Sequence, residues 1–290
     1  MRKAAIDIGT NSCRLLIAEV ISDEIHVLHR ALKTTRIGEG ISQSGKLNAV
    51  AMERTIDCMV DFDHTMQQYG VQQYQAVATS AVREADNRDS FITMMEDRTH
   101  LKVHIIEGEE EARLSYLGVT GSLELERDPL VVDIGGGSTE FIAQKGKFVL
   151  SLPLGAVKGT EQGWGREEIR DRLTPIAQRK EFFSSFPVVG VGGTATTLVA
   201  VKLGLEIYDP QKVHGSRLHK TEIEDLYHLL DKTPLSIRKR LPGLQPERAD
   251  IIPSGALILL TIMEVLEKEE MFVSENDLMQ ALLLEPAISV

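Results

Sequence analysis

The chain has 290 residues, of which 42% are hydrophobic and 26% are charged. A chain of this length can hold two domains with ordinary cores, and this balance is that of a soluble globular protein and not of a disordered chain. The formal net charge of −11 argues against broad coating of nucleic acid or of an anionic membrane surface. A polyanionic ligand would therefore have to be held locally, by backbone amides, a few basic side chains and a divalent metal.

The amino-terminal segment does not have the pattern of a targeting or membrane segment. Asp7, Asn11 and Arg14 interrupt its apolar residues, and no small-residue cleavage site follows. Cys13 and Cys58 are too few for a disulfide framework, and no Cys or His pair has zinc-ligand spacing. We therefore expect a cytoplasmic protein with no membrane partner, whose cysteines are reduced core residues.

The first part of the chain alternates between strand and helix patterns. Apolar runs separated by short polar turns predict a three-stranded meander between Ala4 and Leu32. Strands that alternate with helices after a meander indicate an α/β domain with a mixed sheet. The further elements expected here are helices around 52–66, 88–98 and 108–119 and strands at 74–79 and 101–106.

The second half repeats this scheme and predicts a second domain. A charged run with Gly121 and Pro129 at its ends is the least structured candidate boundary, so we expect domains at 1–122 and 123–290. The C-terminal helix could pack back on the first domain. The elements expected are strands at 130–135, 139–144, 147–154 and 187–193, helical stretches around 166–179, and mostly helix after residue 193.

Residues 131–141 read VVDIGGGSTEF, an apolar strand that breaks into three glycines beside two carboxylates. Glycines without Cβ atoms let a chain turn sharply and present its N–H groups to an anion that comes very close. The simpler interpretation is a tight hairpin whose Asp133 caps the turn, and a lone run of glycines favours it.

A second copy of this motif stands near the start of the chain. DIGTNSCRLLIA at 7–18 aligns without a gap with DIGGGSTEFIA at 133–143, so that Ser12 matches Ser138 and Leu16 matches Ile142. A repeat at this separation is too long for a solenoid and indicates two domains of one topology. We expect the two hairpin tips to line one cleft.

Three further stretches could carry chemistry. Arg83 follows a strand end, where open α/β sheets bind ligands, although a surface arginine paired with Glu84 or Asp86 is the simpler interpretation. GEEEAR places three glutamates, 109–111, at a helix start, where the helix dipole favours acidic residues. Crowding of like charges can also raise a carboxylate's proton affinity, which suits a general base.

GVGGTATTL at 190–198 is a strand-to-helix glycine turn, typical of phosphate binding and equally of close helix packing.

Taken in order, DIGTNSCRLLI, ATSAVREADN, GEEEARLSYLGV, VVDIGGGSTEF and GVGGTATTL closely resemble the motifs of the exopolyphosphatase and guanosine pentaphosphate phosphatase (Ppx/GppA) family, within the actin and Hsp70 superfamily. The segment LPGLQPERADIIPSGALIL at 241–259 is similar to a later signature of that family. The resemblance implies two actin-like, ribonuclease H-like domains with mixed sheets flanked by helices and an active site in the interdomain cleft. It also implies hydrolysis of terminal phosphoanhydride bonds of polyphosphate or of guanosine pentaphosphate, with Mg²⁺ or Mn²⁺.

The resemblance also implies roles for individual residues. Glu111 falls on the glutamate that activates water, and Arg83 falls on the arginine that contacts phosphate. Asp133 and Glu140 fall on the acidic pair associated with the metal. The phosphate-binding positions are Thr10, Asn11, Ser12, Gly136, Gly137 and Ser138, together with the late arginine Arg248.

Two departures from the family pattern limit these expectations. The chain is too short for the helical C-terminal domain of longer members, and Met279 and Ala281 stand where the family has arginine and glycine, so we expect the last helix to pack rather than to bind. Two alternatives stay open: an ATPase or small-molecule kinase of the wider superfamily, and a non-enzymatic alarmone sensor. A homodimer is also left open.

Overall fold

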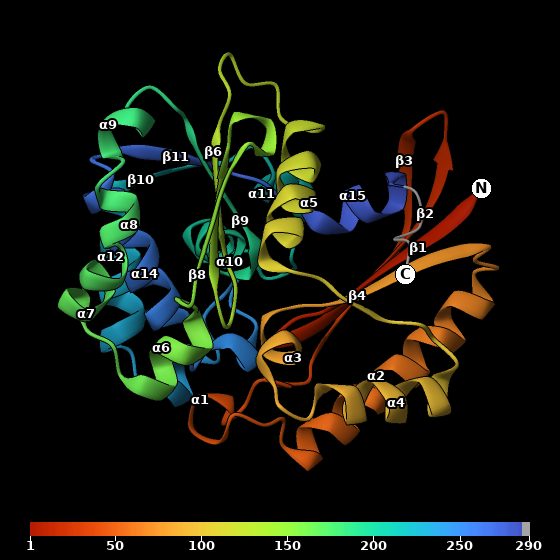
Figure 1. Ribbon diagram of the computed structural model, residues 1–290. Helices are drawn as coiled ribbons and strands as arrows, with labels where there is room; N and C mark the ends of the chain where they lie inside the picture. The colour runs from red at the N-terminus through yellow and green to blue at the C-terminus, as the bar shows by residue number, and fades with distance from the viewer. Residues whose placement is uncertain (286–290) are drawn as a thin grey trace. The chain divides into compact units, whose positions relative to one another are not determined.

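The computed structural model (Figure 1) describes residues 1–285. Its internal contacts divide the chain into two compact units. The first comprises Met1–Leu114 together with the segment that begins at Leu278, and the second comprises Ser115–Asp277. The domain limits expected from the sequence, 1–122 and 123–290, stay a prediction.

The first unit is built on a five-stranded mixed sheet with the strand order β3-β2-β1-β4-β5. The first three strands pair antiparallel, which confirms the expected meander, and β4 and β5 join β1 in parallel. The strand expected at 101–106 is reduced to two residues, because Leu101 and Val103 are buried in the core and do not pair in the sheet. The strands are β1 (Arg2–Ile8), β2 (Ser12–Ile21), β3 (Glu24–Thr34), β4 (Gln73–Ala78) and β5 (His104–Ile105).

This sheet has a core on each of its faces, because successive strand residues point to opposite sides. Ile6 and Ile8 of β1 pack in a cluster with α2 (Ala49–Gln68) and α4 (Arg88–Thr99). Ala5 lies in a separate cluster with Leu114 and with the last described helix. Cys13 and Cys58 are both buried in the first of these cores and are not disulfide-bonded.

The last helix, α15 (Leu278–Leu284), packs on the second face of the first sheet. Met279 and Ala281 are both buried there. Gln75 Nε2 donates a hydrogen bond of 2.6 Å to the carbonyl of Leu282, which ties β4 to this helix. The helix therefore contributes to the core of the first unit.

The second unit contains a six-stranded mixed sheet with the order β10-β11-β9-β6-β7-β8. Five of these strands reproduce the order and the pairing directions of the first sheet, and β10 is added at the edge beyond β11. The strands are β6 (Leu130–Ile134), β7 (Thr139–Ala143), β8 (Phe148–Leu152), β9 (Val188–Val191), β10 (Arg217–His219) and β11 (Glu270–Val273).

The part of the chain after residue 193 is mostly helix, as expected, but it also contains β10 and β11, which the sequence did not predict. These strands have three and four residues, which is too short for an alternating pattern to stand out from the helices beside them. The expectation of two α/β units with mixed sheets is confirmed.

The remaining helices lie in the segments between the strands (Figure 1). Within residues 1–285, no helix combines the length and the apolar character needed to cross a membrane. The helices are α1 (Ile41–Ser44), α3 (Ser80–Glu84), α5 (Gly108–Thr120), α6 (Ala156–Gln162), α7 (Arg166–Arg172), α8 (Thr174–Ala177), α9 (Lys180–Phe183), α10 (Gly192–Lys202), α11 (Pro210–Val213), α12 (Lys220–Lys232), α13 (Leu235–Arg238) and α14 (Ile252–Val265), with 3₁₀ turns at Gln144–Gly146 and Pro246–Arg248.

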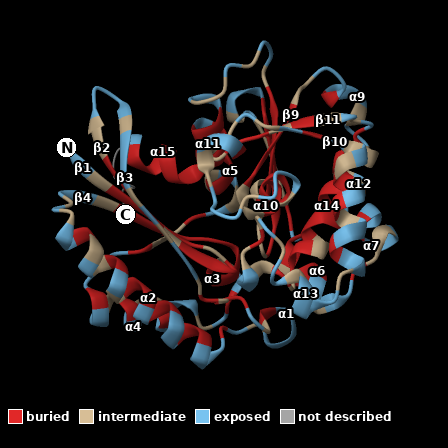
Figure 2. Ribbon diagram, turned by 180° about the vertical axis from the view of Figure 1, so that it is seen from behind, coloured by how far each residue is buried: buried red, intermediate tan, exposed pale blue. Residues whose placement is uncertain are grey.

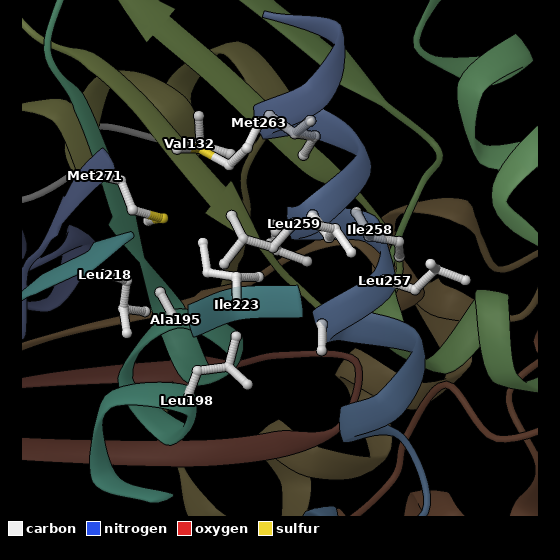
Figure 3. Close-up of a cluster of buried hydrophobic side chains, with 14 of the residues drawn as sticks. Val132, Ala195, Leu198, Leu218, Ile223, Leu257, Ile258, Leu259, Met263 and Met271 are labelled. Carbon is white, nitrogen blue, oxygen red and sulfur yellow. The ribbon is translucent and has the colours of Figure 1, made fainter. Parts of the chain in front are cut away.

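The core of the second unit is centred on α14, whose residues are mostly buried (Figure 2). Leu259 and Met263 of this helix pack with Val132 of β6 and with Ile223 of α12 (Figure 3). Leu130, Val132 and Ile134 all belong to this cluster, so the helix-covered face of β6 takes the even-numbered residues. Asp133 therefore points to the opposite face.

Replacement of Leu259 by alanine should lower the free energy of unfolding by about 2–5 kcal/mol, because a fully buried leucine leaves a cavity that a packed core fills only in part. Urea denaturation measures this change. Leu229→Ala on α12 is the matched control, since that side chain is 46% exposed. Equal effects of the two substitutions would contradict the packing described for α14.

Candidate active site

The first glycine hairpin joins β1 to β2, and its tip carries Thr10, Asn11 and Ser12, all buried. The Gly9 N–H donates to the Ser12 carbonyl at 3.1 Å and closes the turn. Asn11 Nδ2 donates to Ser12 Oγ at 3.2 Å. Among the described residues the Asn11 Oδ1 atom is buried without a hydrogen-bond partner, which is a polar group that a ligand could satisfy.

A segment after β3 supports this tip. The N–H groups of Arg36 and Gly38 donate to the carbonyls of Asn11 and Thr10 at 2.9 and 3.0 Å. A Cβ atom at Gly38 would overlap the Thr10 methyl group, so only glycine permits this approach. Arg36 has a left-handed backbone with φ of 52°, which is uncommon outside glycine. The backbone of the tip is therefore fixed from outside as well as by its own turn.

Arg83 and Glu111 form a largely buried ion pair in the first unit. Arg83 lies in α3, which begins just after β4, and Glu111 lies in the first turn of α5. Arg83 Nη1 donates to Glu111 Oε2 at 3.1 Å and to the Ile106 carbonyl at 2.8 Å. The side chains are only 13% and 11% exposed. The interpretation of Arg83 as a surface arginine paired with Glu84 or Asp86 was therefore wrong.

The three glutamates at the start of α5 have different surroundings. Glu110 pairs with Arg113 at 2.9 Å, and Glu111 pairs with Arg83, whereas Glu109 is exposed. The three glutamates therefore do not form the expected cluster of like charges, because Arg113 and Arg83 each pair with one of them. A guanidinium beside a carboxylate favours the ionised carboxylate, which is the form that accepts a proton.

The second glycine hairpin joins β6 to β7 and places two carboxylates directly opposite one another. Asp133 and Glu140 are partners across the antiparallel pair, and both are buried, at 9% and 2% exposure. Cross-strand partners have Cβ atoms about 5 Å apart and lie on the same face of the sheet. Both carboxylates therefore stand on the face of the second sheet that is opposite to the α14 core.

The two hairpins differ in the charge at one matched position. In the first hairpin the partner of Asp7 across the strands is Arg14. Its Nε donates a hydrogen bond to Asp7 Oδ2 at 2.9 Å, and its Nη2 lies 2.8 Å from the same oxygen in an ion pair. In the second hairpin the matched pair is Asp133 and Glu140. The first copy thus joins its aspartate to a cation, whereas the second places a second anion beside it. The same difference is visible in the sequence, where Arg14 aligns with Glu140.

The tip of the second hairpin, residues 135–138, is fastened to α6. The Ala156 N–H donates to the Gly135 carbonyl, and the N–H groups of Val157 and Lys158 donate to the Gly136 carbonyl. A Cβ atom at Gly155 would overlap the peptide between Gly136 and Gly137, so the two backbones are in direct contact. These bonds occupy carbonyls on one side of the tip, and they fix the peptide planes that carry its N–H groups.

The GVGGT turn joins β9 to α10, beside Asp133. Gly192 has a φ of +75°, and a Cβ atom there would lie 2.5 Å from Asp133 Oδ1. The Arg248 guanidinium lies against Gly193, where a Cβ atom would overlap Nη1. Arg248 Nε also donates to Gln245 Oε1 at 3.0 Å. Gly192 and Gly193 therefore each leave room for a charged side chain.

The donor set of the second hairpin fits a hard divalent cation. Asp133 and Glu140 supply carboxylate oxygens, which Mg²⁺ and Mn²⁺ prefer. Within residues 1–285 no group of three or more His, Cys, Asp or Glu residues could hold a metal ion by itself. Mg²⁺ commonly binds through one or two carboxylates and completes its coordination with water and substrate phosphates, so two carboxylates suffice.

Cys13 follows the first hairpin tip but has no thiolate character. Its hydrogen bond with Cys58, together with complete burial, raises the pKa of the Cys13 thiol well above its ordinary value. A neutral, buried thiol is not a nucleophile. The expectation that the cysteines are core residues is consistent with this environment.

The structure groups the predicted site residues into clusters. Thr10, Asn11 and Ser12 share one tip, and Arg83 contacts Glu111, all in the first unit. Asp133 faces Glu140 in the second unit, which also contains Arg248 and the tip formed by Gly136, Gly137 and Ser138. The cleft expected to unite these clusters stays a prediction.

Two serines beside the carboxylates were missed by the sequence analysis. Ser115 of α5 donates to Asp133 Oδ2, and Ser151 of β8 donates to Glu140 Oε1. Ser151 could have been found from the sequence, because pairing the two predicted strands at 139–144 and 147–154 as a hairpin places it next to Glu140. Ser115 had no such signal, because helix packing determines its contact.

Residues 16–287 match the sequence model of the Ppx/GppA phosphatase family. Exopolyphosphatase 2 of Mycobacterium tuberculosis is 32% identical, and the match covers 99% of this chain and 98% of that protein. A bifunctional 3-dehydroquinate synthase/phosphatase of Fusobacterium nucleatum is 34% identical over 98% of this chain. The chain spans 46% of the length of that relative.

Solved structures show the same fold. The Aquifex aeolicus PPX-GPPA enzyme matches with a TM-score of 0.80 and 34% identity, over 98% of this chain and 99% of that one. An exopolyphosphatase from Cytophaga hutchinsonii matches with a TM-score of 0.89 at 24% identity, over 98% and 97% of the two chains, which speaks for the fold alone. The expected actin-like α/β fold is confirmed.

Gly192→Ala should lower the free energy of unfolding by about 1–3 kcal/mol, because it forces a left-handed alanine and places a methyl group against the Asp133 carboxylate. The neighbouring variant Gly193→Ala should cost less, since it only displaces the flexible end of Arg248. Urea denaturation of both proteins measures the difference. A larger loss for Gly193→Ala would contradict the described geometry.

Proposed function

Because the chain belongs to the Ppx/GppA phosphatase family, we propose that it is a metal-dependent phosphohydrolase that acts on terminal phosphoanhydride bonds. The substrates proposed are inorganic polyphosphate, from which it removes the end phosphate, and guanosine pentaphosphate, from which it removes the 5′ phosphate. The observation that carries this proposal is the buried pair of Arg83 and Glu111 at the start of α5. Exopolyphosphatase 2 of M. tuberculosis, similar over almost the whole chain, supports the choice of polyphosphate.

Glu111 is proposed as the general base that takes a proton from the attacking water. Its carboxylate is buried, and the hydrogen bond from Arg83 to Oε2 restrains the side chain that is proposed to accept the proton. A positioned base typically contributes 10²–10⁴-fold to such a reaction. The exposed neighbour Glu109 lacks this setting.

Arg83 is proposed to contact the phosphate as well as to hold Glu111. A guanidinium has donors on all three nitrogens, and the bonds to Ile106 and Glu111 both use Nη1. Phosphoryl transfer needs charge neutralisation and positioning more than covalent catalysis, so an arginine and a base that share one geometry are appropriate.

Asp133 and Glu140 are proposed to hold Mg²⁺ or Mn²⁺. Two buried carboxylates that stand directly opposite repel one another, and a bound cation offsets this repulsion. The cation would supply Lewis-acid polarisation of a phosphate oxygen when bound. The residues themselves orient four oxygen atoms on one face of the sheet.

The hairpin tips are proposed to bind phosphate oxygens through backbone N–H groups and hydroxyls. Residues Thr10–Ser12 and 136–138 supply these donors, and the bonds from Gly38 and α6 hold the two tips rigid. Rigid donors lose little entropy when a ligand binds, which favours tight binding of an anion. The acceptor at Asn11 Oδ1 suits a water or hydroxyl of the bound substrate.

The test of this function is phosphate release by the purified protein with Mg²⁺, for short polyphosphate, long polyphosphate, guanosine pentaphosphate and ATP. Release from polyphosphate or pentaphosphate supports the proposal, and the ranking identifies the preferred substrate. Release from ATP alone would instead indicate an ATPase or kinase. Binding of guanosine tetraphosphate without release from any compound would indicate a sensor.

Glu111→Gln should reduce the rate of phosphate release by about 10²–10⁴-fold while substrate binding is retained, because the amide keeps the shape of the side chain but cannot accept a proton. Single-turnover kinetics and equilibrium binding measure the two effects. Glu109→Gln, in the same helical turn, is the matched control and should change neither. Full turnover by Glu111→Gln would remove Glu111 from the role of base.

Arg83→Ala should both weaken substrate binding and slow turnover, because it removes a phosphate contact and the residue that holds Glu111. The loss of one charge-assisted hydrogen bond is worth about 1.5–3 kcal/mol, which corresponds to roughly 10–100-fold in kcat/KM. Steady-state kinetics give kcat and KM separately. An unchanged profile would show that Arg83 only stabilises the fold.

A further inference from the structure

Each of the two facing carboxylates accepts a hydrogen bond from a serine hydroxyl on a neighbouring element. We propose that Ser115 and Ser151 are positioning residues that orient Asp133 and Glu140 so that both present an oxygen to one divalent cation. This inference rests on the proposed function, because it assigns a purpose to the metal-binding pair. It assigns a role to Ser151 and to Ser115, which stands within the motif GEEEARLSYLGV but was given no role by the sequence analysis.

Ser115 approaches Asp133 from above the sheet. It is fully buried on α5, and its Oγ donates to Asp133 Oδ2 at 3.0 Å. It follows Glu111 by four residues, so the two side chains lie on one face of the helix, one turn apart. The same helix therefore carries the proposed base and the hydroxyl that fixes Asp133.

Ser151 approaches Glu140 within the sheet. It lies on β8 directly opposite Glu140 in the antiparallel pair of β7 and β8, and its Oγ donates to Glu140 Oε1 at 2.8 Å. Because Glu140 is in turn opposite Asp133, three side chains from three neighbouring strands form a row on one face. The row runs Ser151, Glu140, Asp133.

These contacts constrain the direction of the two carboxylates. A hydrogen bond to one oxygen restricts rotation of a carboxylate and leaves its second oxygen with a defined direction. For Asp133 the second oxygen, Oδ1, lies over Gly192, which has no side chain to obstruct it. Residues that orient metal ligands in this way typically change metal affinity by about 10–100-fold when they are removed.

A purely structural role predicts a different result. Hydroxyls that only satisfy buried carboxylates would stabilise the fold, and their removal would cost about 1–3 kcal/mol of unfolding free energy without a specific effect on the cation. Metal affinity measured on folded protein therefore separates the two roles.

The experiment compares the unmodified protein with Ser115→Ala, Ser151→Ala and the double variant. Free Mn²⁺ is measured by electron paramagnetic resonance in titrations of the purified protein without substrate, and the Mg²⁺ dependence of phosphate release is measured in parallel. Thr120→Ala is the matched control, because its hydroxyl, on the same helix, bonds only the Tyr116 carbonyl among the described contacts. Thermal unfolding shows that each variant is folded, and Ser115→Cys replaces Ser115→Ala if that variant does not fold.

We expect each serine variant to weaken Mn²⁺ binding by about 10–100-fold and to raise the Mg²⁺ concentration for half-maximal activity, while Thr120→Ala changes neither. Equal Mn²⁺ affinity of all variants, or no Mn²⁺ binding by the unmodified protein, would overturn the inference. The proposed function fails separately, if the unmodified protein releases no phosphate from any substrate. Mn²⁺ binding that depends on the serines would then still support the positioning role.

Discussion

The arrangement of the second unit depends on one electrostatic constraint, which is that two buried carboxylates stand opposite each other at the end of a hairpin. Asp133 and Glu140 are held there by strand pairing, and neither can leave without breaking the register of β6 and β7. Like charges in this position are destabilising in the absence of compensation. Ser115 and Ser151 each donate a hydrogen bond to one of these carboxylates. Gly192 leaves space for the Asp133 carboxylate, because a Cβ atom there would lie too close to Oδ1.

In the first unit the matched position avoids this repulsion, because a basic residue stands opposite the aspartate. Its hairpin has the same strand order and the same cross-strand position, but Arg14 occupies the place of the second carboxylate and pairs with Asp7. One duplicated scaffold thus provides an aspartate joined to an arginine and an aspartate beside a glutamate. The topology is common to both copies, and one residue determines whether a positive or a negative charge stands beside the aspartate.

The sequence predicted the fold well where patterns are local. The glycine hairpins, the meander and helices α2, α4 and α5 follow from turn residues and apolar periodicity, and the internal repeat predicted the shared topology. The short strands β10 and β11 were missed because three or four residues do not establish a period. Their place in the sheet depends on tertiary pairing, which local pattern does not contain.

For the candidate site, too, the sequence predicted the residues that stand in local motifs but not the contacts that depend on tertiary structure. The carboxylates, the glycine tips and Arg83 stand in motifs and could be named from the sequence. Glu111 could also be named, but its contact with Arg83 could not, because the two residues are 28 positions apart and meet only through the fold. Ser115 was missed for the same reason, since its role depends on α5 lying over β6.

The course of the chain through the first unit has a consequence for synthesis on the ribosome. The sheet of this unit is complete once β5 has been made, but α15, which covers Ala5, Leu16 and Val77, begins only at residue 278. At ordinary rates of translation the intervening chain takes on the order of ten seconds or more to appear. Throughout that interval the apolar sheet face that contains Ala5, Leu16 and Val77 lacks the helix that covers it in the finished protein.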